Sequence, residues 1–565
     1  MQKKKRKKSV LPVLITIGLI LLISICGVIS FLMERYRPGT ERMDCAEYFG
    51  LTGEDQVALI QNGTVREEKG LLIGGEPYGT YEYVESCLNS CFYWDRDTQQ
   101  ILLTTPEEIK QLIPGDTSVC ATPRGQAAVQ IGEDGTIYLS LDVVKEYTDM
   151  EYAFYNEPAR VVIDTRREQT TQAEVSAQES QVRYRGGIKS EILTDVYAGD
   201  TLTILDEMDE WSKVETTDGY IGYIKREDLS ETFLTEKREA SVMMEFSRIT
   251  RDHKINLVWH QTTSAAANAA FAEMTANMSG VNVISPTWFS VTDNSGILID
   301  RSSAEYVSQA HAAGLEVWGL IENFDPNFDS SEALASSAVR ANVISQLMAA
   351  AESCGMDGIN VDFENLKETA IPHFLQFLRE LTMEAHKRNL VVSVDTPVPQ
   401  SYTEYYDRAE QAKYVDYMIM MGYDEHYAGS EEAGSVASLP FVQAGIEEML
   451  DGIPKEQVIC GIPFYTRVWI ETFGQNAITS EVLGMDGASQ YAEQAGMAIN
   501  WDGSLGQNVA ISETEQARYT IWMEDEDSIA EKMKLIMQYD LAGVAEWKLG
   551  FERADVWEII AGYLK

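Results

Sequence analysis

Residues 357–364 read Asp-Gly-Ile-Asn-Val-Asp-Phe-Glu, a short alternation of polar and apolar side chains that begins at a glycine turn. Successive side chains of a β-strand point to opposite faces, so we expect Asn360, Asp362 and Glu364 on one face. Removing such groups from water is costly unless they have a role. The stretch therefore predicts a parallel strand that delivers an amide and two carboxylates to its C-terminal end, where barrel enzymes carry their sites. A solvated loop entry and a cation site are the alternatives.

The rest of the chain from about residue 254 repeats a strand-then-helix rhythm, which predicts a (β/α)8 TIM barrel. The candidate strands are residues 255–260, 281–285, 316–321, 358–363, 390–394, 415–420, 458–462 and 543–546. The largest gap lies between Phe464 and the last strand and includes the β-rich stretch 498–523. We interpret it as a small α+β insertion that walls one side of the cleft.

The motif at 357–364 matches the signature Asp-Gly-(aliphatic)-(Asp or Asn)-(aliphatic)-Asp-x-Glu at every defined position, so the chain resembles the family 18 glycoside hydrolases. The resemblance implies substrate-assisted retaining catalysis, in which the 2-acetamido oxygen of the substrate attacks the anomeric carbon. It makes Glu364 the general acid and later the base. Asp362 would orient the acetamide and Tyr423 would hold its oxygen. No metal and no organic cofactor is required.

The ends of other predicted strands supply candidate substrate-binding residues. Trp547 follows the eighth strand and would form a stacking floor under the sugar ring, while Asn360 would support the catalytic carboxylates. The remaining candidates are Asp424, Trp288, Asn323, Tyr465 and Arg467, with Asp395 at a further strand end. For Trp288, Asn323, Asp395, Tyr465 and Arg467, structural packing or loop hydrogen bonds are the alternative.

The sequence of the third barrel strand gives evidence about the substrate. Chitinases of this family usually carry Ser-x-Gly-Gly there, whereas residues 318–324 read Trp-Gly-Leu-Ile-Glu-Asn-Phe. Residues 285–289, 312–318 and 543–550 are similar to the branch that contains spore cortex-lytic and related cell-wall N-acetylglucosaminidases. The resemblance thus implies cleavage of β-1,4 bonds after N-acetylglucosamine in peptidoglycan. The alternatives are a chitin-binding chitinase or endo-β-N-acetylglucosaminidase acting on other glycans, and a non-catalytic wall-binding protein.

The N-terminus combines a basic block at residues 3–8 with an uncharged stretch at 9–33. At ~1.5 Å per residue such a stretch spans the ~30 Å hydrocarbon core. The basic block is expected in the cytoplasm, which makes 1–8 a cytoplasmic tail, 9–33 a transmembrane anchor and the C-terminal domains extracellular. A cleaved signal peptide is the alternative.

Two further domains are predicted between the anchor and the barrel, which we place at 247–565. Residues 44–165 contain a weak repeat with a period of 60, each copy with a strand, a short helix and a hairpin, and resemble the duplicated module of the copper amine oxidase N-terminal domain. The polar run 166–180 predicts a linker. The turns and strands of 181–232 are similar to a bacterial SH3 domain.

The formal net charge of −44 is extreme for 565 residues. An acidic surface repels nucleic acid, so nucleic acid is excluded as a partner, and glycan binding must rest on shape, hydrogen bonds and aromatic stacking. We expect a monomer. Four of the seven cysteines, Cys45, Cys87, Cys91 and Cys120, cluster in one region, which indicates two disulfides or, as the alternative, a zinc site.

Overall fold

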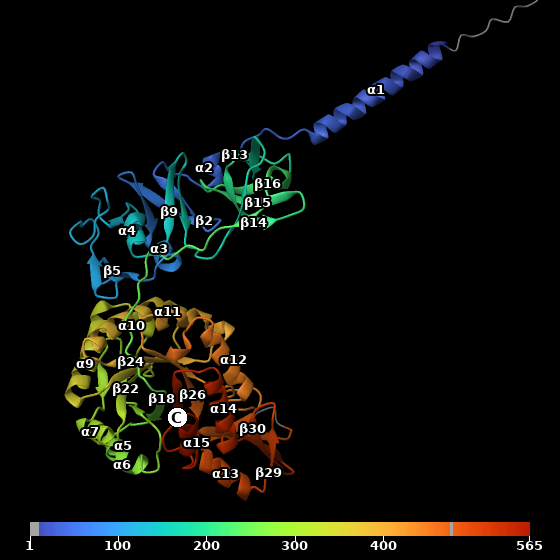
Figure 1. Ribbon diagram of the computed structural model, residues 1–565. Coiled ribbons are helices and arrows are strands. Elements are labelled where there is room, and N and C mark those ends of the chain that lie inside the picture. Colours follow the sequence, from blue (N-terminus) through green and yellow to red (C-terminus); the bar gives the residue numbers. More distant parts are fainter. Residues whose placement is uncertain (1–10, 475–477, 565) are drawn as a thin grey trace, which may run out of the picture. The chain divides into compact units, whose positions relative to one another are not determined.

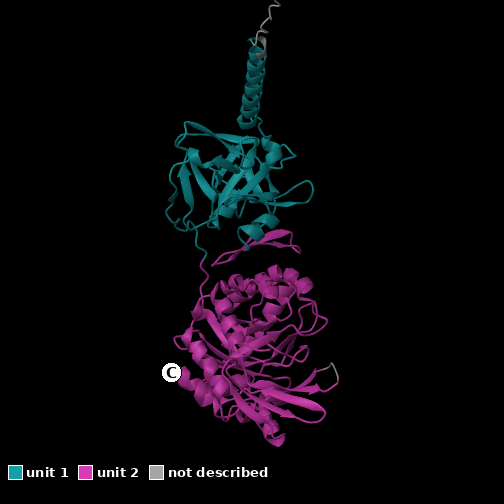
Figure 2. Ribbon diagram, turned by 90° about the vertical axis from the view of Figure 1, so that its right-hand side faces the viewer, with its two compact units in different colours: residues 1–90, 112–244 teal, residues 91–111, 245–565 magenta. Residues whose placement is uncertain are grey.

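The computed structural model describes residues 11–474 and 478–564 and divides into two compact units (Figures 1 and 2). Unit 1 comprises residues 1–90 and 112–244, and unit 2 comprises residues 91–111 and 245–565. The basic tail predicted over residues 1–8 lies outside the described residues.

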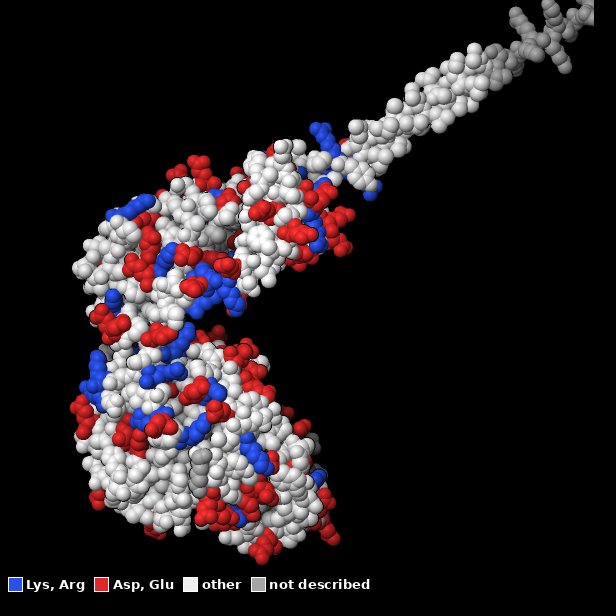
Figure 3. Space-filling view, in the orientation of Figure 1, with Lys and Arg blue, Asp and Glu red and all other residues white. Residues whose placement is uncertain are grey.

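The N-terminal helix α1 (Leu11–Tyr36) is apolar throughout most of its length. Its segment Leu14–Tyr36 has a mean hydropathy of 2.7 and none of it is buried. In Figure 3 the helix is correspondingly free of coloured charged side chains between its two ends. Its length and composition suit a membrane span or a signal sequence.

The first half of unit 1 is a seven-stranded sheet of order β7-β8-β3-β2-β1-β10-β9. Its elements are α2 (Cys45–Tyr48), β1 (Gln56–Gln61), β2 (Thr64–Ile73), β3 (Glu76–Thr80), α3 (Tyr81–Cys87), β7 (Val129–Ile131), β8 (Ile137–Ser140), α4 (Leu141–Glu146), β9 (Glu151–Asn156) and β10 (Ala159–Asp164). The predicted repeat is visible in the element order, because β3, α3 and a hairpin recur 60 residues later as β8, α4 and the β9–β10 hairpin.

The second half of unit 1 is a sheet of order β13-β12-β16-β15-β14-β11-β17. Its strands are β11 (Thr171–Glu174), β12 (Glu179–Arg183), β13 (Ile192–Tyr197), β14 (Thr201–Glu207), β15 (Trp211–Thr216), β16 (Ile221–Lys225) and β17 (Phe233–Leu234). The prediction of a linker over 166–180 was wrong, because β11 pairs with β14 and β17. The only apolar residue of strand β11, Ala173, is fully buried. One small apolar side chain among polar neighbours is too weak a pattern to predict a strand.

Unit 2 is built on a closed barrel of eight parallel strands, in the order β18-β19-β22-β23-β24-β25-β26-β32 and back to β18. The strands are β18 (Ile255–His260), β19 (Val283–Pro286), β22 (Glu316–Glu322), β23 (Gly358–Asp362), β24 (Val391–Pro397), β25 (Tyr417–Met421), β26 (Val458–Pro463) and β32 (Gly543–Trp547). The eight predicted strands are thus confirmed, with ends that differ by a few residues.

Helices surround the barrel (Figure 1). The outward-facing side chains of the strands are buried in one hydrophobic cluster with them. They are α5 (Ala265–Ala269), α6 (Phe271–Met274), α7 (Ala304–Ala312), α8 (Ser330–Ala333), α9 (Ser337–Cys354), α10 (Ile371–His386), α11 (Arg408–Ala412), α12 (Leu439–Leu450), α14 (Glu526–Gln538) and α15 (Val556–Tyr563), and a hairpin of β20 (Phe289–Val291) and β21 (Leu298–Asp300) joins the sheet. A separate inner cluster, which includes Trp259, Trp318 and Tyr417, fills the barrel itself.

The predicted α+β insertion is confirmed as a lobe between β26 and α14. It contains β27 (Tyr465–Thr472), β28 (Ile478–Gly484), α13 (Met485–Gln494), β29 (Ala498–Asp502), β30 (Gln507–Glu513) and β31 (Ala517–Trp522). The strands form a sheet of order β28-β27-β31-β30-β29. One face of this sheet packs on α13 through Val468, Ala510 and Ile521.

A small sheet of β4 (Phe92–Asp95), β5 (Gln100–Thr104) and β6 (Ile109–Leu112) groups with the barrel, although its sequence belongs to the first copy of the N-terminal repeat (Figure 2). Tyr93 on β4 is buried, and its hydroxyl lies 2.7 Å from Nδ1 of His373 on α10. The guanidinium of Arg340 on α9 lies 5.0 Å from the centre of the Tyr93 ring. We call residues 91–111 the docked hairpin.

The expected pairing of four cysteines into two disulfides is not observed, because Cys45 and Cys87 carry free thiols. Their sulfurs accept hydrogen bonds from the Tyr220 hydroxyl and the Arg66 guanidinium, respectively. Within the described residues no group of three or more His, Cys, Asp and Glu is arranged to hold a metal ion.

Candidate active site

Strand β23 alternates as its sequence predicts. Ile359, Val361 and Phe363 pack outward against the helices, and Asn360 points into the barrel. Gly358 is required by a close approach, because a Cβ atom there would lie 2.8 Å from both the Trp318 ring and the backbone oxygen of Val391. The glycine of the motif thus lets the strand lie against the inner core.

Asn360 is fully buried and has a partner for each side of its amide. Its Oδ1 accepts hydrogen bonds from Trp259 Nε1 at 2.9 Å and Ser285 Oγ at 3.1 Å. Its Nδ2 donates to Asp395 Oδ1 at 2.7 Å and to Ser393 Oγ at 3.0 Å. Because a satisfied buried amide has one favourable orientation, Asn360 fixes the position of Asp395.

Asp362 and Glu364 open into a cleft of about 560 Å³ at the C-terminal end of the barrel. The cleft contains five carboxylates, namely Asp362, Glu364, Asp395, Asp424 and Glu425, and the aromatic rings of Trp259, Phe324, Tyr402, Tyr423, Tyr427, Phe441, Tyr465 and Trp547. Oδ1 of Asp362 is buried there and has no hydrogen-bond partner among the described residues. An unpaired buried acceptor of this kind is ready to receive a donor from a ligand.

Burial and mutual repulsion keep these carboxyl groups protonated to unusually high pH. Desolvation raises the pKa of Asp362 well above its ordinary value, and the charges of Asp395 and Glu364 add to the effect. Desolvation likewise raises the pKa of Glu364, with further contributions from Asp424 and Glu322. The pKa of Asp395 is also raised by burial, against the opposing effect of its bond from Asn360. The site therefore holds a proton to higher pH than free carboxyl groups would.

The loop after β25 brings a phenol and a carboxylate to the cleft. Tyr423 lines it beside Tyr465, with ring centres 6.1 Å apart. Asp424 has a left-handed backbone with φ of 60° and accepts a hydrogen bond from the Tyr465 hydroxyl. Burial raises the pKa of the Tyr423 phenol well above its usual range, so it remains a donor across the physiological range.

Trp547 at the end of β32 lines the cleft and packs edge-to-face on Trp259, with ring centres 5.9 Å apart. The peptide bond from Trp547 to Lys548 is cis. The support of one indole by another gives the cleft a rigid apolar surface against which a flat sugar face can stack.

Asn323 controls the backbone that follows β23. Its Oδ1 accepts from the Glu364 amide at 2.9 Å, and its Nδ2 donates to the Glu364 carbonyl at 2.9 Å. It does not line the cleft. Asn323 is therefore a positioning residue for Glu364 and not a ligand contact.

One rim of the cleft is formed by residues 425–438, which we call the rim loop. Glu425 and Tyr427 line the cleft, and Glu425 accepts from the backbone and hydroxyl of Ser438 at 2.8 and 3.0 Å. Ser435 donates to Gln507 on β30 at 2.5 Å, and Gln507 donates to Glu524 at 2.7 Å.

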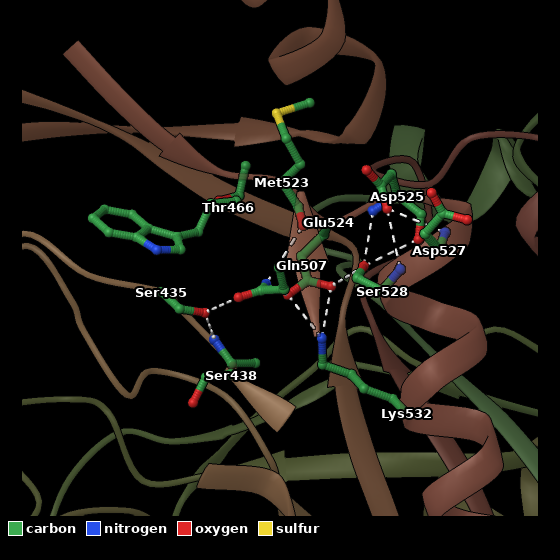
Figure 4. Close-up of polar contacts among 12 residues, drawn as sticks. Ser435, Ser438, Thr466, Gln507, Met523, Glu524, Asp525, Asp527, Ser528 and Lys532 are labelled. Carbon is green, nitrogen blue, oxygen red and sulfur yellow. Dashed lines mark hydrogen bonds and ion pairs between the residues drawn. The ribbon is translucent and has the colours of Figure 1, made fainter. Parts of the chain in front are cut away.

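Glu524 in turn forms a fully buried ion pair with Lys532 on α14 at 2.9 Å, so hydrogen bonds run from α14 through the lobe to the rim loop (Figure 4). The bonds between Glu425 and Ser438 thus tie the two ends of the rim loop together, and the buried chain of hydrogen bonds holds the loop at Ser435.

Comparison with known proteins assigns the domains. The model of the glycosyl hydrolases family 18 matches residues 323–552, which include Asp362, Glu364, Tyr423 and Trp547. The chain carries a family 18 glycosyl hydrolase domain. Residues 181–230 match the bacterial SH3 domain. The catalytic unit is thereby a glycoside hydrolase, as the sequence motif predicted.

Curated relatives of this family 18 domain include proteins of Bacillus and a probable chitinase of Drosophila melanogaster. The uncharacterized glycosylase YvbX of Bacillus subtilis is 25% identical over 305 residues, which cover 52% of this chain and 87% of that protein. The cortical fragment-lytic enzyme of Bacillus subtilis is 25% identical over 235 residues, which cover 40% of this chain and 54% of that protein. The match thus spans most of the first relative and about half of the second.

The solved structure of the Bacillus cereus spore cortex-lytic enzyme SleL has a similar fold. It aligns with a TM-score of 0.51 and 18% identity, over 58% of this chain and 79% of that chain. At this identity the likeness establishes the barrel fold of the family 18 domain and nothing further.

Two residues predicted to bind substrate lie away from the cleft of the family 18 domain. Trp288 is fully buried, donates to Asn268 Oδ1 at 2.8 Å and packs on Tyr306. Arg467 belongs to the lobe sheet and donates to Ser480 Oγ at 2.8 Å. Asn360 lies beneath the cleft and bonds Asp395, in keeping with the supporting role proposed for it, and Asn323 lies behind the cleft. Three of the proposed contacts, namely Trp288, Arg467 and Asn323, are therefore structural. A strand-end position alone does not specify the direction of a side chain.

Several cleft residues were missed from the sequence. Phe324, Tyr402 and Tyr427 line the cleft and are 54%, 75% and 55% exposed. They lie in loops, where the sequence has no periodic pattern from which the direction of a side chain can be predicted. Trp259 could have been found, because it stands at the end of the first strand, next to its last residue. Asp395, which the sequence placed at a strand end, does line the cleft.

Proposed function

We propose that the family 18 domain cleaves β-1,4 bonds after N-acetylglucosamine in peptidoglycan, by retaining, substrate-assisted catalysis. The observation that carries the proposal is the cleft that holds Asp362 and Glu364, both with raised pKa values, beside the phenol of Tyr423. An acid with a raised pKa keeps its proton to higher pH than a free carboxyl group does, which is what protonation of a glycosidic oxygen needs.

In the first step the acetamide oxygen of the sugar attacks its anomeric carbon. The bond from that carbon to the leaving oxygen breaks, and Glu364 delivers its proton to that oxygen. The unpartnered Oδ1 of Asp362 accepts the acetamide N–H, which orients the nucleophile and stabilises the positive charge of the oxazolinium ion. The Tyr423 hydroxyl donates to the acetamide oxygen before attack, and Trp547 supports the ring.

In the second step the Glu364 carboxylate removes a proton from water. The oxygen of that water attacks the anomeric carbon, the bond to the acetamide oxygen breaks, and the acetamide is restored with net retention of configuration. Glu364 regains its proton and is ready for the next cycle. Burial raises the pKa of Asp362, and Asp395, which is held by Asn360, adds repulsion to this effect.

Peptidoglycan is proposed as the substrate because of a similar enzyme and because of the other domain in this chain. The similar cortical fragment-lytic enzyme is named for a wall substrate, and the chain also carries a bacterial SH3 domain. Helix α1 would anchor the chain in the membrane with both units outside the cell. If the anchor is intact, the mass of the chain isolated from membranes includes residues 1–8, whereas a cleaved signal sequence would remove them.

The test is to digest purified peptidoglycan with the full-length chain in detergent, reduce the new ends with borohydride and identify them by mass spectrometry. We expect reduced N-acetylglucosamine, and a loss of activity of at least about a thousandfold in Glu364→Gln. The matched control is Glu368→Gln, because Glu368 is exposed and four residues away. Reduced muramic acid ends would refute the bond assignment, and cleavage of chitin oligomers in place of peptidoglycan would move the substrate to chitin.

A further inference from the structure

A second hollow lies on the insertion lobe, with a volume of about 850 Å³. Its walls include Glu471 on β27, Asn500 and Trp501 on β29, and Arg518 and Trp522 on β31. None of the residues that line it also lines the catalytic cleft. We call it the lobe groove.

The pairing register of the lobe sheet places Glu471, Arg518, Trp522 and Asn500 on one face, whereas Trp501, next to Asn500 on the edge strand β29, alternates to the other face and lines the groove at the sheet edge. Directly opposed residues of neighbouring strands share a face, and Trp522 opposes Val509 while Arg518 opposes Glu471. Asn500 opposes Val509 in the same way. This face is the one turned away from α13, whose partners Val468 and Ile521 alternate with the groove residues.

The same face continues to the catalytic cleft. Along β27 the side chains of Tyr465, Trp469 and Glu471 share it, since they are separated by even numbers of residues. Tyr465 lines the cleft and Glu471 the groove, while Trp469 between them is buried and donates to the Gly434 carbonyl of the rim loop at 2.8 Å. The rim loop therefore lies between two hollows on one continuous surface.

The groove has the chemistry of a carbohydrate site. Trp501 is 46% exposed and lines the groove from β29, and Trp522, which is half-buried, lines it from β31, with β30 between the two strands. Nε of Arg518 is buried with no hydrogen-bond partner among the described residues, and its nearest carboxylate oxygen, on Glu513, is 3.9 Å away. Indole faces that water wets and a buried donor without an acceptor are both unfavourable in the free protein, and a polar ring that stacks and accepts would relieve both.

We propose that the lobe groove binds a second stretch of N-acetylated glycan outside the catalytic cleft, so that the enzyme holds its polymer at two places. The proposal rests on the proposed function for the class of polymer. Charge argues against a polyanionic ligand, because Glu432, Glu471 and Asp502 outnumber the guanidinium of Arg518 in the groove. The sugar rings of a neutral glycan fit both the indoles and the charge.

The experiment measures binding without turnover. The full-length Glu364→Gln chain in detergent is compared with the same chain carrying Trp501→Ala and Trp522→Ala, by depletion onto insoluble peptidoglycan and, separately, onto chitin. The control is Phe473→Ala in the same background, because Phe473 is 53% exposed on the lobe but does not line the groove. Thermal unfolding checks that all variants are folded.

We expect the double substitution to weaken retention on the polymer by on the order of tenfold. In the chain that keeps Glu364, turnover of N-acetylglucosamine tetramer, a reaction of the cleft, should change less than twofold with the two tryptophan substitutions. Phe473→Ala should behave as its parent. Weaker retention on one polymer alone supports the groove and identifies that polymer. Equal retention of the double variant on both polymers overturns the proposal, whereas absence of hydrolysis by the unmodified chain overturns only the proposed function.

Discussion

The proton on Glu364 depends on charges around it that do not touch the substrate. Burial is the main cause of its raised pKa, and Asp424 and Glu322 add repulsion. Glu322 lies on β22 and does not line the cleft, but its carboxylate accepts a hydrogen bond from the backbone of Phe324, which does. The amide oxygen of glutamine can accept the same bond, so the charge can be removed while this contact is kept.

We therefore predict that Glu322→Gln moves the alkaline limb of the kcat/KM profile to lower pH, by a few tenths to about one unit. The sign follows because less repulsion lowers the pKa of the acid, so the protonated form is lost earlier as pH rises. Glu305→Gln on α7, an exposed carboxylate of the same unit, should leave the profile in place. A limb that moves to higher pH in Glu322→Gln would contradict this electrostatic account.

Gly358 is a second residue whose role can be measured. A methyl group there would press on the Trp318 ring and on the Val391 carbonyl, neither of which can move freely inside the barrel. We predict that Gly358→Ala lowers the free energy of unfolding by about 1–3 kcal/mol. Gly562→Ala in α15, where a Cβ meets no atom within 4 Å, should be neutral or stabilising by up to about 1 kcal/mol. Urea unfolding distinguishes them, and equal effects would show that the close approach is unimportant.

At the residue level the sequence predicted what lies on the motif strand and missed what lies in loops. The period of two assigned Asp362 and Glu364 to the cleft, because strand geometry dictates alternation. It could not show that Trp288 points into the core, since that depends on β20 and α7 packing around it. Nor could it find Tyr402 or Tyr427, whose directions are set by tertiary contacts of irregular backbone.

At the level of elements, the rim loop depends on a helix that never reaches the cleft. Lys532 on α14 is 1% exposed and neutralises Glu524, which orients Gln507 and through it Ser435. Removing one member of a buried ion pair leaves the other charge uncompensated, which costs about 3–5 kcal/mol.

We predict that Lys532→Met lowers the free energy of unfolding by about 3–5 kcal/mol. It should also lower kcat, because the rim loop becomes mobile. The loss of unfolding free energy should be larger at pH 8 than at pH 5. Burial raises the pKa of Glu524 to about 6 even beside Lys532, and this pKa rises further when Lys532 is removed. Below that pKa the folded protein holds Glu524 as a neutral acid, and the charge penalty disappears.

The control is Lys534→Met on the same helix, since the Lys534–Glu531 pair is mostly exposed and should be worth less than about 1 kcal/mol. If Lys532→Met and Lys534→Met unfold alike at pH 8, the buried chain of hydrogen bonds does not stabilise the lobe.

The elements themselves were largely predictable. All eight barrel strands and the insertion follow from apolar runs separated by amphipathic helices, because such runs have few other ways to be buried. Strand β11 escaped notice because Thr171–Glu174 offers a single small apolar residue. The sequence also could not predict that β4 and β5 group with the barrel. This grouping depends on contacts between Tyr93 and residues nearly 250 and 280 positions away.

At the scale of the whole molecule the net charge of −44 decides how the chain can meet its polymer. Acidic side chains outnumber basic ones across the sequence and are spread over the face seen in Figure 3. Attraction between opposite charges therefore cannot bring an anionic wall to this surface.

We predict that raising NaCl from about 50 to about 500 mM leaves retention on peptidoglycan unchanged or strengthens it, because salt screens only repulsion here. Sedimentation of the Glu364→Gln chain with purified walls measures this directly. A tenfold loss of retention at high salt would show that a local basic patch drives binding.

The docked hairpin has a topological consequence. The chain passes between the units at 90–91, at 111–112 and again at 244–245, so the two units are interleaved along the sequence. A single nick near residue 244 would leave the fragments held together, since β4 stays buried against α9 and α10 through Tyr93. The catalytic unit therefore cannot be released by one proteolytic event, and a gene fragment that begins at the barrel would encode an incomplete enzyme with a bare docking face.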